Sequence, residues 1–270
     1  MSLFWLRVAA GLYGISMVYG LIALLRRREI LSRATLPIAA IALNLHFVAL
    51  VEAFRSGSMA SMPLHESESL LAFLMMFLFV AVYYLWGTTS PGIVVLPTAF
   101  LLTLSAALAQ SAPRFASPLI RSGWIYTHVV LILAGYSALF FSLVASFLYL
   151  LHERSLKNKK LNGFAGKLPA LETIDDIGYR LLLIGFPFMT LGLIAGSIIA
   201  QAQFGTAFMH DPKVVLSLLV WAVYIVLIYT RWSAGWRGRR AAVLAGIACV
   251  AALSAWAANY VSGMHRFITK

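Results

Sequence analysis

The stretch GWIYTHVVLILAGYSALFFSLVASFLYL, residues 123–150, contains no Asp, Glu, Lys or Arg. A hydrocarbon core about 30 Å thick is crossed by about twenty residues of α-helix, at about 1.5 Å per residue. This stretch is therefore long and apolar enough to cross a membrane as one helix. Its apolar residues are continuous and do not alternate with a period of two, which argues against a β-barrel strand.

The rest of the chain repeats this pattern. Of 270 residues, 61% are hydrophobic and 11% are charged, against about 45–50% and about 25% in soluble proteins. This composition excludes a soluble enzyme, a nucleic-acid-binding module and a disordered protein. We predict an all-α polytopic bundle, a single membrane domain over residues 1–270 embedded in the lipid bilayer. Its eight expected spans are residues 4–25, 34–53, 69–86, 92–110, 123–150, 181–201, 214–230 and 241–261.

The distribution of basic residues predicts the orientation of these spans. The net charge is +12, but the 21 Lys and Arg residues gather in short segments between the apolar runs, where positive charge marks the cytoplasmic side. Fourteen of the 21 lie in segments 26–33, 152–180 and 231–240, and seven lie in the alternate segments and the termini. We therefore place both termini on the non-cytoplasmic side. Segment 152–180 is expected to be a solvated connector with a short amphipathic helix.

Three histidines are expected to meet at the non-cytoplasmic face. His128 lies about 8 Å below the outer end of its span, at about 1.5 Å per residue. His210 belongs to the external loop 202–213, and His265 follows the last span. Neutral imidazole is a common metal ligand, and two imidazoles can bind haem iron from opposite faces. The alternative is that His128 hydrogen-bonds a neighbouring helix and that His265 is a solvated residue near the C-terminus.

Other chemistry has weaker support in the sequence. There is no Ser-His-Asp arrangement with a glycine elbow, no Gly-rich phosphate loop and no carboxylate pair at membrane depth. The single cysteine, Cys249, cannot form a disulfide or a cysteine metal site within one chain. His65 with Glu66 and Glu68 could bind a divalent cation, although such an external acidic segment is usually only solvated. We therefore expect no complete catalytic site in this chain.

Four stretches after residue 120 resemble a known family, the cytochrome c assembly proteins of the CcsA, ResC and HemX-like type. Residues 121–270 carry this resemblance, whereas the spans of residues 1–120 match only in hydropathy. The stretches are Thr127-His128-Val129 with Gly135-Tyr136-Ser137-Ala138-Leu139; Gly185-Phe186-Pro187 through Thr190-Leu191-Gly192 to Gly196; Phe204-Gly205 through His210-Asp211-Pro212-Lys213 to Trp221 and Tyr224; and Gly235-Trp236-Arg237-Gly238 through Gly263-Met264-His265.

The resemblance implies a haem site on the external loop. Family members carry the loop signature Trp-Gly-x-x-Trp-x-Trp-Asp, which cradles haem between two external histidines. Matched by motif, these ligands of the haem iron would be His128 and His265. The cofactor-binding residues implied are His128, His265, His210, Phe204, Gly205, Phe208, Asp211 and Trp221.

This sequence departs from the family signature at several positions. Phe204, Phe208 and His210 stand where the family has tryptophan. Phenyl rings can still stack on a porphyrin, and an imidazole at 210 could bind iron or a propionate while Asp211 accepts a hydrogen bond from its other nitrogen. The alternative is that an exposed loop tolerates a polar residue there. The family's intramembrane histidine corresponds to Tyr229, so a second, internal haem site lacks that imidazole, and His46 could supply one instead.

Together these features predict a haem-handling protein of c-type cytochrome assembly in the bacterial cytoplasmic (inner) membrane. We expect it to work with an apocytochrome-holding or another assembly subunit, and not to be a complete cytochrome c synthase alone. The alternative is a haem-free regulatory or scaffold protein that docks partners through its basic cytoplasmic loop. No nucleic-acid partner is expected.

The orientation can be tested with reporter fusions. Because positive charge marks the cytoplasmic side, a fusion after Lys160 should report a cytoplasmic position and a fusion after Lys270 an external one. A cytoplasmic reporter signal after Lys270 would contradict the predicted orientation and would separate His265 from the external loop.

Overall fold

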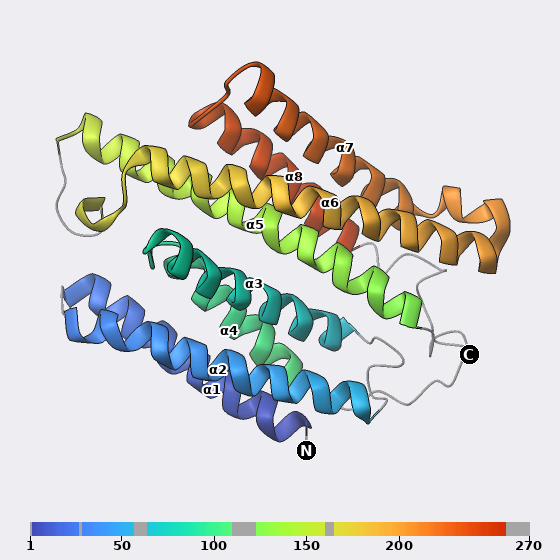
Figure 1. Ribbon diagram of the computed structural model, residues 1–270, viewed down its shortest axis with the longest axis horizontal. Coiled ribbons are helices and arrows are strands. Elements are labelled where there is room, and N and C mark those ends of the chain that lie inside the picture. Colours follow the sequence, from blue (N-terminus) through green and yellow to red (C-terminus); the bar gives the residue numbers. More distant parts are fainter. Residues whose placement is uncertain (1, 27–28, 57–63, 110–122, 160–164, 258–270) are drawn as a thin grey trace. The chain divides into compact units, whose positions relative to one another are not determined.

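A computed structural model describes residues 2–26, 29–56, 64–109, 123–159 and 165–257. Within these ranges the chain forms α-helices and short 3-10 helices, with no strand, which confirms the predicted all-α polytopic fold (Figure 1). The α-helices are α1 (Ser2–Arg26), α2 (Glu29–Arg55), α3 (Leu64–Trp86), α4 (Gly92–Leu108), α5 (Gly123–Lys157), α6 (Leu171–Phe204), α7 (Pro212–Ser233) and α8 (Arg239–Ala257), and the 3-10 helices are η2 (Ala165–Lys167) and η3 (Gly205–His210).

Each of the eight predicted spans corresponds to one of these helices. In the described ranges, α1, α2, α3, α5, α6 and α7 are long and apolar enough to cross a membrane, and α4 is a shorter apolar helix of 17 residues. The chain is thus a multi-pass membrane protein. The side of the membrane on which each terminus lies stays a prediction.

The segment between α5 and α6 is more helical than predicted. Helix α5 continues to Lys157, beyond residue 150, and α6 begins at Leu171, well before residue 181. Lys157 Nζ lies 2.7 Å from the Glu153 carboxylate one turn away, a pair that stabilises a helix outside the apolar region. The solvated connector expected over residues 152–180 is therefore much shorter than that range.

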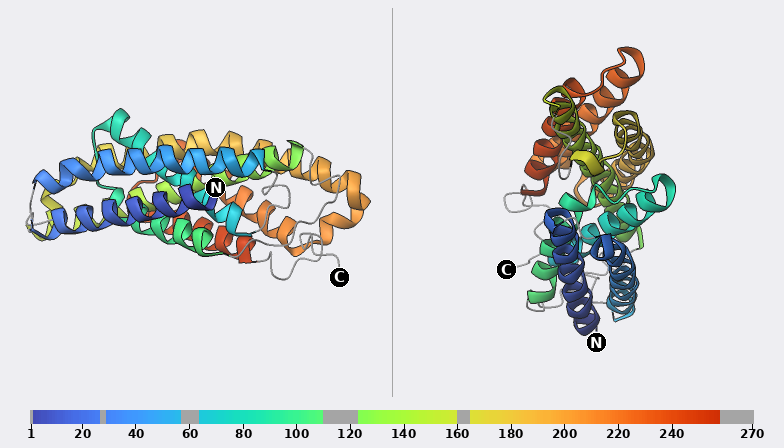
Figure 2. Two further views of the ribbon diagram at one scale, coloured as in Figure 1. Left: turned by 90° about the horizontal axis from the view of Figure 1, so that it is seen from below. Right: turned by 90° about the vertical axis from the view of Figure 1, so that its left-hand side faces the viewer.

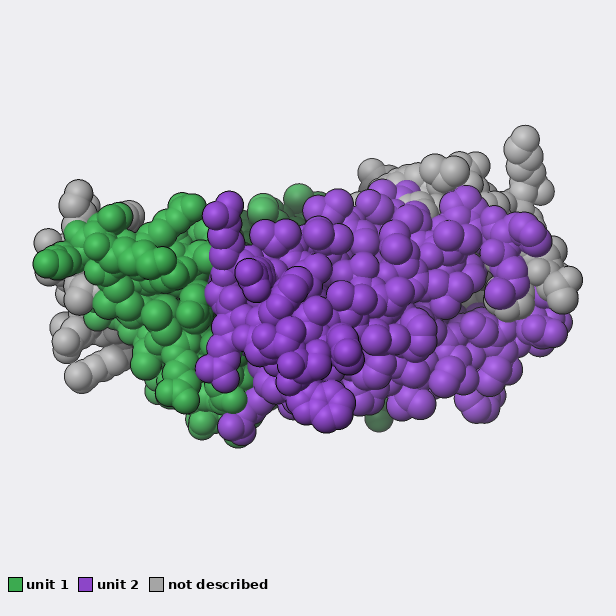
Figure 3. Space-filling model, turned by 90° about the horizontal axis from the view of Figure 1, so that it is seen from above, with its two compact units in different colours: residues 1–113, 147–177 green, residues 114–146, 178–270 purple. Residues whose placement is uncertain are grey.

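The chain divides into two compact units (Figure 3). Unit 1 comprises residues 1–113 and 147–177, and unit 2 comprises residues 114–146 and 178–270. Helices α5 and α6 contribute to both units, because the boundaries fall within them. That the chain acts as a single membrane domain stays a prediction.

Unit 1 is built around α1, which packs along α2 and α4, while α3 packs against α4 and α2 (Figures 1 and 2). One of its core clusters joins Leu6 and Ala10 of α1 to Ala49 of α2 and to Ala106 and Ala107 of α4. Four of these five buried residues are alanines, and small residues allow helix backbones to approach closely in membranes.

A buried histidine connects three helices of unit 1. The His46 side chain in α2 is fully buried. Its Nε2 lies 2.9 Å from the Ser69 hydroxyl of α3, and its Nδ1 lies 3.4 Å from the Tyr13 hydroxyl of α1. Its ring also makes edge contacts with Tyr13 and Phe73. Both ring nitrogens therefore have protein partners, which favours a structural role for His46.

Replacing His46 tests this role. His46→Ala removes both hydrogen bonds and leaves a cavity, so the free energy of unfolding should fall by about 2–4 kcal/mol. Titration with sodium dodecyl sulfate in mixed micelles measures this value. The control is Asn44→Ala in the same helix, because the Asn44 amide is exposed and donates to the Ala40 carbonyl of its own helix. Equal decreases in the free energy of unfolding of the two variants would contradict the structural role of His46.

Candidate functional site

The predicted external loop consists of a helix end, one short helix and a helix start. Helix α6 ends at Phe204, and Gly205 follows with φ of 59°, a left-handed conformation that glycine adopts readily. After η3, the Asp211 carboxylate accepts a hydrogen bond from the Lys213 backbone N–H at 2.8 Å, and Pro212 occupies the first turn of α7. Asp and Pro are favoured at these helix positions, so the Asp-Pro-Lys sequence fixes where α7 begins.

His128 is held between α5 and α6 within unit 2. It lies in the second turn of α5, and its Nδ1 is 2.7 Å from the Gly192 carbonyl oxygen of α6. A carbonyl oxygen can only accept, so Nδ1 carries the proton and donates it, and Nε2 keeps its lone pair. The predicted hydrogen bond from His128 to a neighbouring helix is therefore present, and it leaves the other ring nitrogen able to bind a metal.

Two glycines of α6 make room for this arrangement. A Cβ atom at Gly196 would collide with the His128 imidazole, and one at Gly192 would lie 2.8 Å from Ile132 Cδ1. His128 and Ile132 are one helical turn apart on α5, as Gly196 and Gly192 are on α6, so the two pairs match across the contact. These glycines accept side chains of α5 as well as allowing the helix backbones to approach.

Lys213 brings a positive charge to this part of unit 2. It lies in the first turn of α7, close enough to His128 and to Asp211 for electrostatic interaction with both. The start of α7 is thus near the imidazole of α5. The arrangement places a ring nitrogen that can bind a metal near an ammonium group, which suits a ligand that carries both a metal and acidic groups.

Trp221 lies in the middle of α7 and packs against the hydrophobic core of unit 2. Its indole N–H donates to the Thr190 hydroxyl of α6 at 3.0 Å, and its ring stacks on Phe186 with centroids 6.4 Å apart. Tyr136 of α5 is hydrogen-bonded to Ser217 of α7. Trp221 therefore helps to join α6 to α7 within the hydrophobic core, and its predicted contact with a cofactor stays a prediction.

The remaining predicted site residues are described only in part. His210 is exposed at the end of η3, and its pairing with the neighbouring carboxylate stays a prediction. The side chains of Phe204 and Phe208, and His265 as a whole, lie outside the residues that the structure describes. The structure thus brings His128 near the start of α7 and does not test the pairing of His128 with His265.

Sequence reasoning missed the partners of these side chains. Thr190, Gly192 and Gly196 belong to a stretch that resembles the family, but the resemblance did not indicate which side chains they contact, and Ser217 was not singled out. The one available indication was that His128 and Ile132 are four residues apart on α5, the same separation as that of Gly192 and Gly196 on α6. It could not be used because apolar runs do not reveal which helix faces meet.

Three curated proteins that are similar to this chain have the same name. A cytochrome c biogenesis protein CcsA of Trieres chinensis is 28% identical over 217 residues, which cover 68% of this chain and 69% of that protein. One from Chlamydomonas reinhardtii is 28% identical over 202 residues, covering 72% and 56% respectively. One from Thermosynechococcus vestitus is 31% identical over 202 residues, covering 60% and 63%. The chain thus spans about 56–69% of the length of these relatives.

The sequence model of one protein family, described as cytochrome C assembly protein, matches residues 12–265. The match begins in α1, so it includes the N-terminal helices, for which only hydropathy had suggested the resemblance. It also contains the whole segment from His128 to His265. The chain therefore belongs to the cytochrome c assembly protein family.

Proposed function

We propose that this protein holds haem at the non-cytoplasmic face of the bacterial cytoplasmic membrane during assembly of c-type cytochromes. His128 and His265 would be the two axial ligands of the haem iron. The family membership and the name shared by the curated relatives support a role in cytochrome c biogenesis. Haem, its position and the identity of both ligands are parts of the proposal.

The observation that carries the proposal is the tautomer and orientation of the His128 imidazole ring. Donation from Nδ1 to the Gly192 carbonyl at 2.7 Å fixes one tautomer and orients the ring. Metal-binding histidines almost always use their second nitrogen in this way, which raises the basicity of the ligating nitrogen. His128 thus fits the requirements of an axial ligand. Haem would supply an iron centre that accepts an imidazole on each face.

Other residues of unit 2 would position the cofactor. Lys213 could pair with a propionate, since an ammonium group binds an exposed carboxylate as a point charge. His210 is exposed at the end of the loop and could contact iron or a propionate, with Asp211 orienting its ring. Phe204 and Phe208 would make aromatic contacts with the cofactor. Trp221 would stabilise the loop by joining α6 to α7. Gly205 and Asp211 would set the path of the loop between α6 and α7.

The protein would supply haem and not complete the covalent attachment alone. Thioether bonds require cysteines of an apocytochrome, so we propose that a partner subunit presents that substrate. A haem-free scaffold that docks partners through its basic cytoplasmic segment is the second candidate. The observation that favours it is the Lys157 side chain at the end of α5, which is 73% exposed. Haem content separates the two candidates.

The absorbance spectrum of the purified full chain tests the ligands. With two axial imidazoles, the reduced and oxidised spectra should be those of low-spin haem. His128→Ala or His265→Ala should give a high-spin or haem-depleted protein, and added imidazole should partly restore the low-spin spectrum. The histidine control is His65→Ala, which should leave the spectrum unchanged. Low-spin spectra retained in both ligand variants would rule out this pair, and a haem-free protein with normal folding would favour the scaffold.

A second test uses the glycine beneath the ring. Gly196→Ala should displace the imidazole of His128, lowering the haem-to-protein ratio and also the free energy of unfolding by about 1–3 kcal/mol. The matched control is Gly246→Ala in α8, where an added Cβ meets nothing within 4 Å. Gly246→Ala should leave the haem-to-protein ratio unchanged. Its free energy of unfolding should be unchanged or slightly higher, because alanine favours a helix. Normal haem content in a destabilised Gly196→Ala protein would contradict the proposed place of His128.

A further inference from the structure

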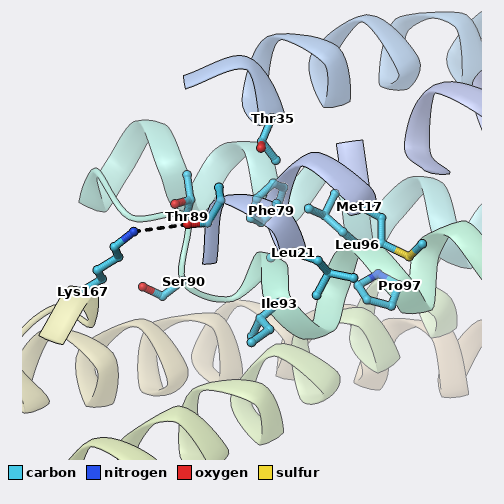
Figure 4. Close-up of a pocket in the computed structure, with 13 residues that line it drawn as sticks. Met17, Leu21, Thr35, Phe79, Thr89, Ser90, Ile93, Leu96, Pro97 and Lys167 are labelled. Carbon is cyan, nitrogen blue, oxygen red and sulfur yellow. Dashed lines mark hydrogen bonds between the residues drawn. The ribbon is translucent and has the colours of Figure 1, made fainter. Parts of the chain in front are cut away.

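A cavity of about 110 Å³ lies within unit 1, between α1, α2, α3, α4 and η2 (Figure 4). Its lining separates into two parts. Lys167, Thr89 and Ser90 gather on one side, and the opposite side is apolar, with Leu21 and Leu96 among its residues. By the same measure one water needs only about 10–15 Å³. The cavity can therefore hold a tetrahedral anion with a few attached atoms, and it is too small for a porphyrin.

The polar side of the cavity is positively charged. The Lys167 ammonium donates to the Ala23 carbonyl at 3.5 Å, a long hydrogen bond. An ammonium group has three donors, and Lys167 forms no ion pair within the part of the chain that the structure describes. Its other donors, with the hydroxyls of Thr89 and Ser90, can meet an anion. Phosphate oxygens are strong acceptors for such charge-assisted hydrogen bonds.

The two sides of the cavity lie at different depths along the spans. Ala23 ends the first candidate span and Trp86 ends the third, and Thr89 and Ser90 follow that end. Leu21 lies inside the first span, as Phe79, another lining residue, lies inside the third. We therefore expect the polar side at the level of lipid headgroups and the apolar side nearer the acyl chains. The distribution of basic residues predicts that this end is cytoplasmic, where anionic lipids are enriched.

We propose that this cavity binds the phosphate group of an anionic phospholipid. The phosphate would accept hydrogen bonds from Lys167, Thr89 and Ser90, and the first carbons of the lipid would lie against Leu21 and Leu96. Free inorganic phosphate shares the charged group but has no apolar part to fill the opposite side. This site belongs to unit 1, and it does not depend on the proposed haem function.

The test measures lipid binding to the delipidated full chain by titration and native mass spectrometry. The probes are dioleoyl phosphatidylglycerol, dioleoylglycerol, which has the same chains without phosphate, and inorganic phosphate. Lys167→Gln removes the charge. Gly20→Met fills the cavity, because an added Cβ at Gly20 makes only ordinary contacts of 3.6 Å with Leu96 and Thr35 and longer side chains extend further. The controls are Gly20→Ala and Lys157→Gln, the latter at an exposed lysine paired with Glu153.

The starting protein should bind phosphatidylglycerol about tenfold more tightly than dioleoylglycerol, as expected for a charge-assisted contact. Lys167→Gln should abolish this preference, and Gly20→Met should weaken phosphatidylglycerol binding about tenfold. Both controls should match the starting protein. A preference for phosphatidylglycerol that persists in Lys167→Gln would contradict the proposed site. Equal affinity of the starting protein for phosphatidylglycerol and dioleoylglycerol would also contradict it.

The phosphate probe distinguishes the two sources of the anion. Inorganic phosphate should compete with phosphatidylglycerol only weakly. If it binds as tightly as the phospholipid, and Lys167→Gln abolishes both, the lipid assignment is wrong and the cavity is a site for free phosphate. Circular dichroism and thermal unfolding verify that each variant is folded. Should Gly20→Met be unfolded, Lys167→Gln still decides the outcome, because the Lys167 side chain is exposed and its hydrogen bond to the Ala23 carbonyl is long, at 3.5 Å.

Discussion

Three buried or half-buried polar side chains in the described part of this protein find partners on neighbouring helices, since the hydrocarbon of a bilayer offers no water to satisfy them. In unit 1, the imidazole of His46 joins α2 to Ser69 of α3. In unit 2, His128 joins α5 to a backbone carbonyl of α6, and Trp221 joins α7 to Thr190 of α6. Each bond fixes which faces of two helices meet. Apolar surface alone would not, since lipid tails are as apolar as the helices themselves.

The number and type of helices could be predicted from the sequence, because crossing a membrane requires long apolar runs. The ends of α5 and α6 could not. Apolarity marks where a helix is in lipid, whereas α5 extends to Lys157 through polar residues stabilised by pairs such as Glu153 with Lys157. The division into two units was also beyond reach, because every span has the same apolar character and contacts between spans leave no mark on composition.

Only part of the candidate site could be predicted, again because the sequence does not show which helix faces are in contact. His128 could be selected because an imidazole at membrane depth is costly without a purpose. The sequence left two roles open, a metal ligand or a hydrogen bond to another helix. The structure shows that Nδ1 takes the second role, and metal binding through Nε2 stays a prediction. Trp221 was assigned to the cofactor through its place after the loop motif, and that assignment stays a prediction. Its packing on Phe186 in the core could not be predicted, because sequence position cannot show which way a helical side chain points.

The short length of α4 has a consequence for the membrane itself. Its 17 residues measure about 26 Å at about 1.5 Å per residue, less than the roughly 30 Å of an average hydrocarbon core. Such hydrophobic mismatch is relieved by local thinning of the bilayer, at a fraction of a kcal/mol per Å. We therefore expect the bilayer to be thinner beside α4 than elsewhere, and membranes of different hydrocarbon thickness to accommodate the protein at different energetic cost.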